Sequence, residues 1–281
     1  MKESHKFFAT NDNVKLHYIE PGEGNKKVIV MIHGWAQSAD SFKNQVQGLS
    51  EKYHIYALDL RGHGESEKPQ EGYRIFRLSK DVHDFITGLD LNDIVILGHS
   101  MGCAVIWGYW ELFRNERISK IVLVDEMASV AGNPVWSEEE KTNYGPIFDT
   151  SALYGMYKEF LGPNGVAIAD DFVAPMCTEN ISKVLLDKLL EESHKLPIDK
   201  AAQLFLDHCL INWQDVIKTI NIPTLIVNGA ISHVPYKSTQ WISSIIPGCK
   251  LETFSAEECG RHFMFLENPV KFNKIIQDFV G

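Results

Sequence analysis

The distribution of apolar residues along the first half of the chain indicates a sheet covered by helices. Short, nearly continuous apolar runs alternate with longer amphipathic segments, which is typical of parallel strands buried on both faces. One earlier stretch, residues 14–19, instead alternates apolar and polar positions and predicts an antiparallel edge strand. The buried strands are expected at residues 28–32, 55–58, 94–97 and 121–124.

The second half of the chain contains two different patterns. The strand signal is absent from 126 to 213, where turn residues separate segments with helical spacing. Strands return at 224–227 and 251–254, and a final helix begins at Pro269. The helices of the strand-free segment are expected at 153–161, 181–195 and 198–211.

The length of 281 residues and the composition, 44% hydrophobic and 23% charged, suit one globular α/β domain that carries an insertion. We expect a mostly parallel, doubly wound sheet whose core comprises residues 1–125 and 214–281. Residues 126–213 are expected to form a helical lid. A hydrophobic core of this size needs no disulfide or metal to fold.

Charge and cysteine content restrict the partners and the compartment. The net charge of −10 disfavours nucleic acid and anionic membranes as partners. The five cysteines form no C-x-x-C pair, so we expect neither a disulfide framework nor a zinc site. The first ten residues lack the apolar run of a signal peptide, and no segment approaches the ~20 apolar residues of a membrane span. These features predict a cytoplasmic protein that acts on a small molecule without a metal or cofactor, and they leave a homodimer open.

A catalytic nucleophile is expected at Ser100. The pentapeptide GHSMG at 98–102 matches G-x-S-x-G, follows the strand at 94–97 and precedes an apolar helical run at 103–113. In such a strand–turn–helix setting the nucleophile takes a strained backbone conformation, so the positions two residues away must be small. The amides at the start of the helix would stabilise negative charge at the serine. The alternative is a serine that only caps a helix after a glycine turn.

The segment HGW at 33–35 follows the strand at 28–32 and resembles the α/β-hydrolase family, in which a His-Gly dipeptide at this place positions an oxyanion donor. The resemblance implies an oxyanion hole built from the backbone N–H groups of Trp35 and Met101. Residues 59–66, DLRGHGES, are similar to an architectural loop of the same family. The matching segments occur in family order over most of the chain outside the insertion.

A serine hydroxyl needs an adjacent base to act as a nucleophile at neutral pH. Among the eleven histidines, His262 lies between the last strand and the final helix and resembles the histidine loop of the family. It also obeys the chain order in which the nucleophile comes first and the histidine last. The weaker candidates for the base are His194, His208 and His233.

The acid of the expected triad departs from the commonest family arrangement. The loop after the strand at 224–227 reads GAISHVP, which places Ser232 where the family usually has Asp. A carboxylate is still needed to fix the imidazole tautomer and to stabilise the imidazolium. Asp125 ends the strand at 121–124, where some haloalkane dehalogenases and the cofactor-independent quinolone dioxygenases carry an acid. We therefore predict Asp125 as the acid; the alternatives are a site without an acid, Glu126, Glu257 and Glu258.

A substrate pocket is expected between the lid and the carboxyl ends of the strands. The lid is rich in aromatic residues, most of which should form its own core. No cluster of basic residues marks a phosphate or carboxylate site, which favours a neutral, fairly apolar ester or lactone. The predicted pocket residues are Gln37, Trp107, Trp136, Tyr144 and Phe148.

Three functions are compatible with these features. The first is hydrolysis of an ester or lactone through an acyl-enzyme, with Ser100 as nucleophile and His262 as general base. The second is ring opening of an N-heteroaromatic, quinolone-type compound by a cofactor-independent dioxygenase, which the HGW segment, Asp125 and the altered late loop resemble. Ala36 and Gln37 follow the Trp where that group has a substrate-holding histidine, which favours the hydrolase. The third is a non-catalytic binding module.

Overall fold

The computed structural model describes residues 4–21 and 26–281 and places, within these ranges, eight strands in one sheet. The strand order is β1-β2-β4-β3-β5-β6-β7-β8; β1 and β2 run antiparallel, and β3 to β8 are parallel. The predicted mostly parallel sheet is therefore confirmed, while residues 1–3 and 22–25 of the predicted core lie outside the described residues. The strands are β1 (His5–Ala9), β2 (Lys15–Ile19), β3 (Val28–Ile32), β4 (His54–Leu58), β5 (Ile94–His99), β6 (Ile118–Val124), β7 (Thr224–Gly229) and β8 (Lys250–Phe254).

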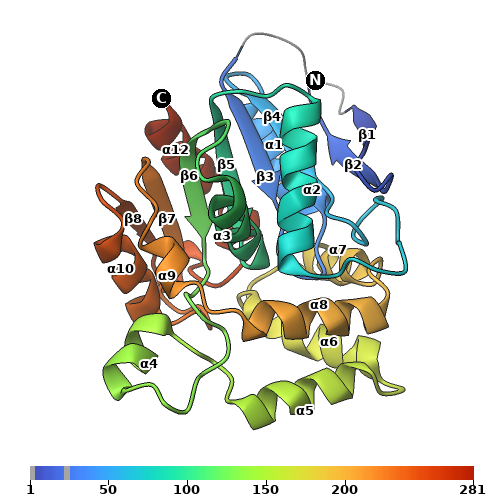
Figure 1. The fold of residues 1–281 in the computed structure, drawn as a ribbon, viewed down its shortest axis with the longest axis vertical. Coiled ribbons are helices and arrows are strands. Elements are labelled where there is room, and N and C mark those ends of the chain that lie inside the picture. The colour runs from blue at the N-terminus through green and yellow to red at the C-terminus, as the bar shows by residue number, and fades with distance from the viewer. Residues whose placement is uncertain (1–3, 22–25) are drawn as a thin grey trace.

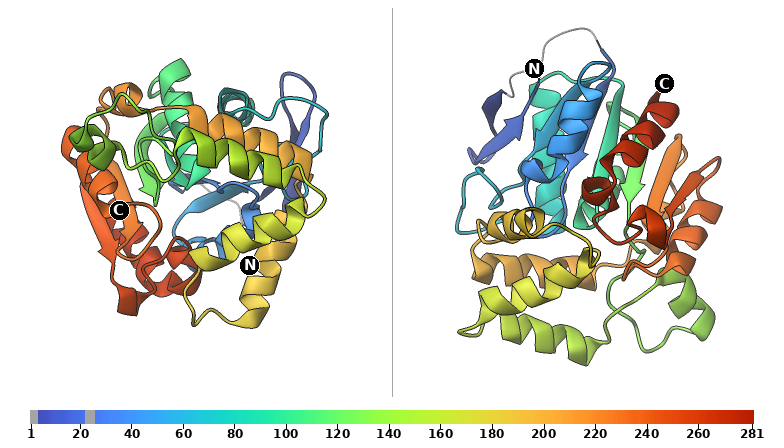
Figure 2. Two further views of the ribbon diagram at one scale, coloured as in Figure 1. Left: turned by 90° about the horizontal axis from the view of Figure 1, so that it is seen from below. Right: turned by 180° about the vertical axis from the view of Figure 1, so that it is seen from behind.

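Helices cover both faces of the sheet, which explains why its central strands are continuous apolar runs. α2 (Ile75–Gly88) and α3 (Met101–Phe113) pack against each other on one face, and α1 (Lys43–Leu49) and α12 (Pro269–Val280) pack together on the other (Figures 1 and 2). The remaining core helices are α9 (Gln214–Ile217), α10 (Tyr236–Ile245) and α11 (Met264–Glu267), with the short 3₁₀ helices η1 (Ala39–Phe42) and η3 (Ala256–Glu258).

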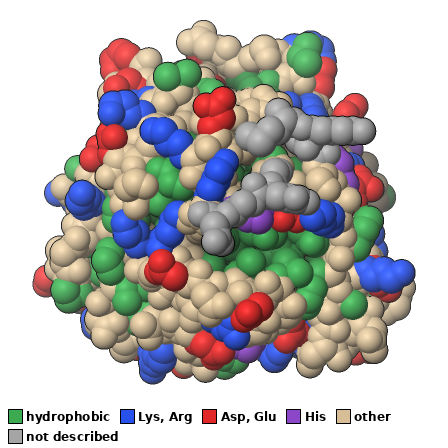
Figure 3. Space-filling view, turned by 90° about the horizontal axis from the view of Figure 1, so that it is seen from above, with side chains coloured by type: hydrophobic (Ala, Val, Ile, Leu, Met, Phe, Trp, Pro, Cys, Tyr) green, Lys and Arg blue, Asp and Glu red, His purple; other side chains and the backbone are tan. Residues whose placement is uncertain are grey.

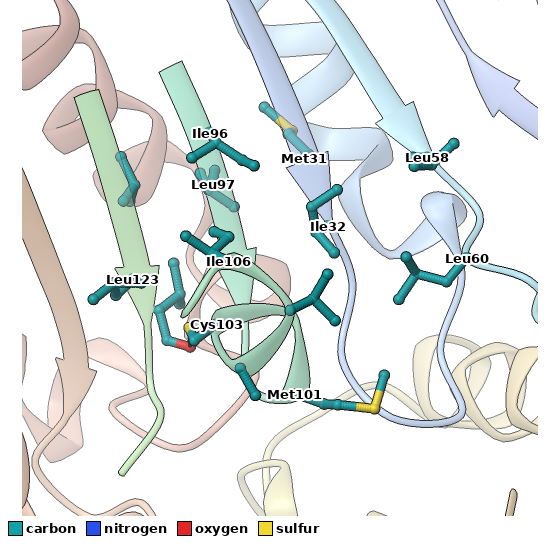
Figure 4. Packing of buried hydrophobic residues seen from close by; sticks show 14 of the residues in the cluster. Met31, Ile32, Leu58, Leu60, Ile96, Leu97, Met101, Cys103, Ile106 and Leu123 are labelled. Carbon is teal, nitrogen blue, oxygen red and sulfur yellow. Dashed lines mark hydrogen bonds between the residues drawn. The ribbon is translucent and has the colours of Figure 1, made fainter. Parts of the chain in front are cut away.

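The hydrophobic core is densest where β3, β5 and β6 meet the first turns of α3. Figure 4 shows Met31 and Ile32 of β3, Ile96 and Leu97 of β5, and Leu123 of β6 around Cys103 and Ile106 of that helix. All six residues of β5 are buried. Full burial of one such aliphatic side chain contributes about 1.5–3 kcal/mol, so this packing holds the turn between β5 and α3 rigidly in place.

The chain between β6 and β7 crosses the carboxyl ends of the parallel strands, toward which the arrow of β6 points in Figure 1. An isolated β-bridge between Ser129 and Asn212 brings the two ends of this segment together. In this fully described segment five α-helices form, two more than predicted. They are α4 (Glu138–Tyr144), α5 (Thr150–Phe160), α6 (Gly165–Val173), α7 (Lys183–Ser193) and α8 (Ile198–Leu210), with the 3₁₀ helix η2 (Ala174–Met176) between α6 and α7.

The two unpredicted helices are short, with seven and nine residues, and α4 also lacks an apolar stripe. α4 reads EEEKTNY and begins with a capping box, in which the Ser137 hydroxyl accepts from the Glu140 N–H and the Glu140 carboxylate accepts from the Ser137 N–H. Such a cap stabilises a helix start without hydrophobic periodicity. α6 is short and carries small residues on its buried side, namely Gly165, Ala169 and Val173.

The surface shown in Figure 3 carries charges of both signs, and the cysteines are unpaired. Seen from the end opposite the lid, acidic and basic side chains are intermingled (Figure 3). All five cysteines are free thiols. In the part of the chain that the structure describes, no helix combines the length and apolar character needed to cross a membrane.

Candidate active site

Ser100 occupies the tight turn between β5 and α3. Its backbone angles are φ 53° and ψ −129°, a sparsely populated conformation for a residue with a side chain. The Ser100 N–H donates to the carbonyl of Val124 at 2.9 Å, which ties the turn to the end of β6. The strained conformation is therefore held from both sides, by α3 and by the neighbouring strand.

The glycines around Ser100 are required by close backbone contacts. A Cβ atom on Gly98 would lie 2.5 Å from the carbonyl oxygen of Gly102, and one on Gly102 would lie 2.3 Å from that of Ile32. A Cβ on Gly34 would lie 3.1 Å from the Cβ of Ser100. These distances explain G-x-S-x-G in this chain, because α3 can approach β3 and β5 only where the side chain is a hydrogen atom.

Two backbone N–H groups beside Ser100 have no protein acceptor within the described residues, those of Trp35 and Met101. Met101 is the first residue of α3, so its N–H has no partner inside the helix. The loop that carries Trp35 is fixed by His33, whose Nε2 accepts from the Leu60 N–H at 3.1 Å and whose Nδ1 donates to the Gly34 carbonyl at 2.8 Å. Neither N–H group is therefore used by a hydrogen bond of the described chain.

His262 and Asp125 form a buried pair. Nδ1 of His262 lies 2.7 Å from Oδ2 of Asp125, and the two side chains are 3% and 0% exposed. The backbone of His262 is held on both sides: its N–H donates to the carbonyl of Met176 in the lid at 3.1 Å, and its carbonyl lies 3.0 Å from Nε2 of His99. Ser100 and His262 line the same cavity, and within the described residues the Ser100 hydroxyl has no hydrogen-bond partner of its own.

Asp125 accepts two further hydrogen bonds from the loop after β7. The Gly229 N–H donates to Oδ1 at 3.0 Å, and the Ser232 hydroxyl donates to Oδ2 at 2.5 Å. Burial raises the pKa of Asp125, and these two donors oppose that rise. Burial also lowers the pKa of His262, which keeps the imidazole neutral, as a general base must be.

The alternative acids Glu126 and Glu258 have partners other than His262. Glu257 and Glu258 lie on η3, and Glu258 pairs with Lys271 at 2.5 Å. Glu126 lies in the cavity, where its Oε2 is 3.5 Å from Nε2 of His208. Asp125 is the carboxylate that contacts His262.

The weaker histidine candidates each have a different environment. His194 pairs with Asp170 at 2.8 Å on the lid surface. His208 extends from α8 into the cavity, next to Glu126. His233 lies at the cavity rim with its ring centroid 4.4 Å from that of His262, and it forms no pair with a carboxylate in the described chain. Of the four histidines, His262 has the shortest contact with a buried carboxylate, 2.7 Å to Asp125, and lines the cavity with Ser100.

The cavity that holds Ser100 and His262 has a volume of about 50 Å³ and lies between the lid and the sheet. Of the predicted pocket residues, Gln37 lines it. Polar residues around it that the sequence did not assign to a pocket are Glu126, His208 and His233. Its apolar lining comprises Trp35, Met127, Val130, Ile147, Phe172, Val173, Met176, Phe205, Cys209 and Phe263.

Four predicted pocket residues lie elsewhere, which corrects the expectation. Trp107 is fully buried in α3 against Trp213, and Phe148 packs behind the lining on Phe172 and Phe205. Trp136 and Tyr144 stack edge to face with each other, and Tyr144 does so with Trp241 of α10. Aromatic content marked the lid correctly as apolar, but it does not tell which side of a short helix faces the cavity.

Metal ligands are not grouped in the described part of the chain: no cluster of three His, Cys, Asp or Glu side chains there could hold an ion. The groups gathered around Ser100 are the His262 imidazole with its Asp125 partner and the N–H groups of Trp35 and Met101.

Comparison with known proteins places the chain in one family. The family model for the alpha/beta hydrolase fold matches residues 27–269. A non-heme chloroperoxidase, CPO-A1 of Kitasatospora aureofaciens, is 25% identical over 281 residues, covering 97% of this chain and 98% of the relative. Crystal structures of a bromoperoxidase from Bacillus anthracis (TM-score 0.88, 22% identity) and of the esterase EaEST from Exiguobacterium antarcticum (TM-score 0.87, 23% identity) each align over 99% of both chains. The protein is a member of the α/β-hydrolase fold family.

Proposed function

We propose that this protein is a serine hydrolase that cleaves a carboxylic ester or lactone through an acyl-enzyme. The observation that carries the proposal is the 2.7 Å contact between His262 and Asp125, made at the wall of the cavity that also holds Ser100. A base held by a buried carboxylate beside a strained serine is the arrangement that activates a hydroxyl for attack on a carbonyl.

In this mechanism Nε2 of His262 removes the proton from the Ser100 hydroxyl as Oγ attacks the ester carbonyl. The N–H groups of Trp35 and Met101 stabilise the oxyanion of the tetrahedral intermediate. His262 then gives its proton to the leaving alcohol. In the second half of the reaction His262 takes a proton from water, the water oxygen attacks the acyl carbonyl, and the proton returns to Ser100 as the acid is released. Asp125 holds the imidazole in the productive tautomer and stabilises the imidazolium at each step.

The cavity supports a substrate with a short acyl group. Its volume is small, about 50 Å³, which favours a short acyl group over a long one. The apolar side chains of Phe172, Phe205 and Val130 favour an uncharged acyl part. We therefore place small esters and lactones ahead of long-chain lipids as substrates.

The proposal is tested by labelling with a fluorophosphonate probe, which reacts with an activated serine. Wild-type protein should be labelled and should hydrolyse short p-nitrophenyl esters, and Ser100→Ala should do neither. Oxygen uptake on a hydroxyquinolone in the absence of ester hydrolysis would instead establish the dioxygenase. A protein that binds ligands but shows no labelling and no turnover would be a binding module. Halide oxidation with hydrogen peroxide is a further assay, because two of the named relatives are peroxidases.

A further inference from the structure

The catalytic cavity contains polar groups that the proposed triad does not use. Gln37, Glu126 and His208 line it and are 1%, 5% and 7% exposed. Nε2 of Gln37 and Nδ1 of His208 have no hydrogen-bond partner among the described residues. Buried polar atoms are nearly always paired in folded proteins, because leaving one unpaired is unfavourable. Both residues line the same cavity, where a bound ligand can supply the missing partners.

The contact between Glu126 and His208 determines which kind of partner His208 needs. Oε1 of Glu126 accepts from the Met127 N–H at 2.8 Å, and Oε2 lies 3.5 Å from Nε2 of His208. A carboxylate can only accept, so the favourable arrangement puts the imidazole proton on Nε2. Nδ1 then carries a lone pair and requires a hydrogen-bond donor.

Gln37 needs the opposite partner. Its Oε1 accepts from the Ser41 hydroxyl at 3.4 Å, which orients the amide so that Nε2 is the unpaired atom. This NH₂ group is a donor and requires an acceptor. The two residues come from different elements, Gln37 from the loop after β3 and His208 from α8, and both line the cavity.

We propose that Gln37, Glu126 and His208 form a specificity subsite for a neutral hydroxyl group on the acyl part of the substrate. A hydroxyl donates to one group and accepts from another, so it satisfies both unpaired atoms, which a plain alkyl chain cannot do. A carboxylate is excluded, since it has no donor, Glu126 repels it, and no Lys or Arg is among the residues that line the cavity. This inference rests on the proposed esterase function and narrows its substrate to hydroxy-acid esters and lactones.

The test compares ethyl esters whose acyl chain carries a hydroxyl at the second, third or fourth carbon with their deoxy analogues. The readout is the ratio of kcat/KM for each hydroxylated ester to that of its analogue. Gln37→Leu and His208→Phe remove one unpaired atom each at similar volume, and Glu126→Gln removes the charge that orients His208. His194→Phe is the matched control, because this lid histidine also pairs with a carboxylate but lies outside the cavity lining.

For at least one chain position we expect the ratio to fall about tenfold in Gln37→Leu and in His208→Phe, and less in Glu126→Gln. His194→Phe should keep the wild-type ratio. Fluorophosphonate labelling of Ser100 in each variant identifies those that have folded with an intact site. If all labelled variants retain the wild-type ratio, the proposed subsite is wrong, while the proposed esterase function is unaffected. Wild-type protein without labelling or ester hydrolysis would overturn both.

Discussion

The Ser232 hydroxyl donates to the same oxygen of Asp125 that contacts Nδ1 of His262, at 2.5 Å and 2.7 Å respectively. Ser232 stands where relatives usually carry the acid, and Asp125 precedes it by 107 residues in the sequence. The side chains of Ser232 and His262 therefore meet at one oxygen of Asp125. We expect that a carboxylate at position 232 would also reach the imidazole of His262.

Replacement of Asp125 by Asn tests the role of this carboxylate. We expect kcat for a short ester to fall by about 10⁴, because the amide no longer fixes the tautomer of His262 or stabilises the imidazolium. The shape of the side chain is kept, so the thermal unfolding midpoint should stay close to that of the wild type. Turnover within tenfold of the wild type would remove Asp125 from the triad.

A second substitution should recover part of this loss. In Asp125→Asn combined with Ser232→Asp, a carboxylate returns to the position that the family commonly uses, beside the same imidazole. We expect kcat at least about tenfold above that of Asp125→Asn alone, since one carboxylate per histidine restores the charge pairing. Ser232→Glu in the same background is the control for geometry. No gain from Asp would show that this loop cannot deliver a carboxylate to His262.

The pH dependence of activity should respond to Ser232. Its hydrogen bond lowers the pKa of Asp125 against the rise that burial causes, so its removal raises that pKa. Activity requires the Asp125–His262 pair to have lost its proton, and the acid limb of kcat/KM against pH reports this loss. We therefore expect Ser232→Ala to shift the acid limb to higher pH. Ser244→Ala, on the exposed side of α10, should leave the profile unchanged, and an acid-ward shift in Ser232→Ala would contradict the assignment.

Two glycine-to-alanine substitutions should act in opposite directions. Gly102→Ala places a Cβ 2.3 Å from the backbone carbonyl of Ile32 and should lower the free energy of unfolding by about 1–3 kcal/mol or more. Gly155→Ala, in α5, meets no atom within 4 Å and should raise it by roughly 0.5–1 kcal/mol, as alanine stabilises a helix relative to glycine. Urea titration of both variants measures these changes. Equal stabilities would show that α3 can move away from β3.

Much of the fold is readable from the sequence because its strands are buried on both faces. The predicted strand at 28–32 coincides with β3, and that at 121–124 forms the end of β6. The edge strand β1 was missed: it is mostly exposed and lies against β2 alone, so its residues carry no burial pattern. The periodicity of apolar residues reflects burial, so it does not detect a strand that is exposed.

The candidate site also has a part that the sequence predicts and a part that it does not. The positions of Ser100, Trp35 and His262 follow from local motifs, and Asp125 follows from the loss of the usual acid in the late loop. The wall of the cavity depends on how α6 and α8 turn their side chains, which is set by packing among distant residues such as Phe172 and Phe205. From the sequence Glu126 was only an alternative acid, and its place in the cavity lining was not predicted.

The hydrogen bond from the His262 N–H to the Met176 carbonyl joins the general base to the lid. The neighbouring side chain of Arg261 donates to the carbonyl of Pro175 at 2.9 Å, so η2 and the histidine loop are bonded together at two points. For protein engineering this means that lid and catalytic machinery are not independent modules. In a chimera that receives the lid of a relative, we expect His262 to keep its position only if η2 and the loop around His262 are transferred together.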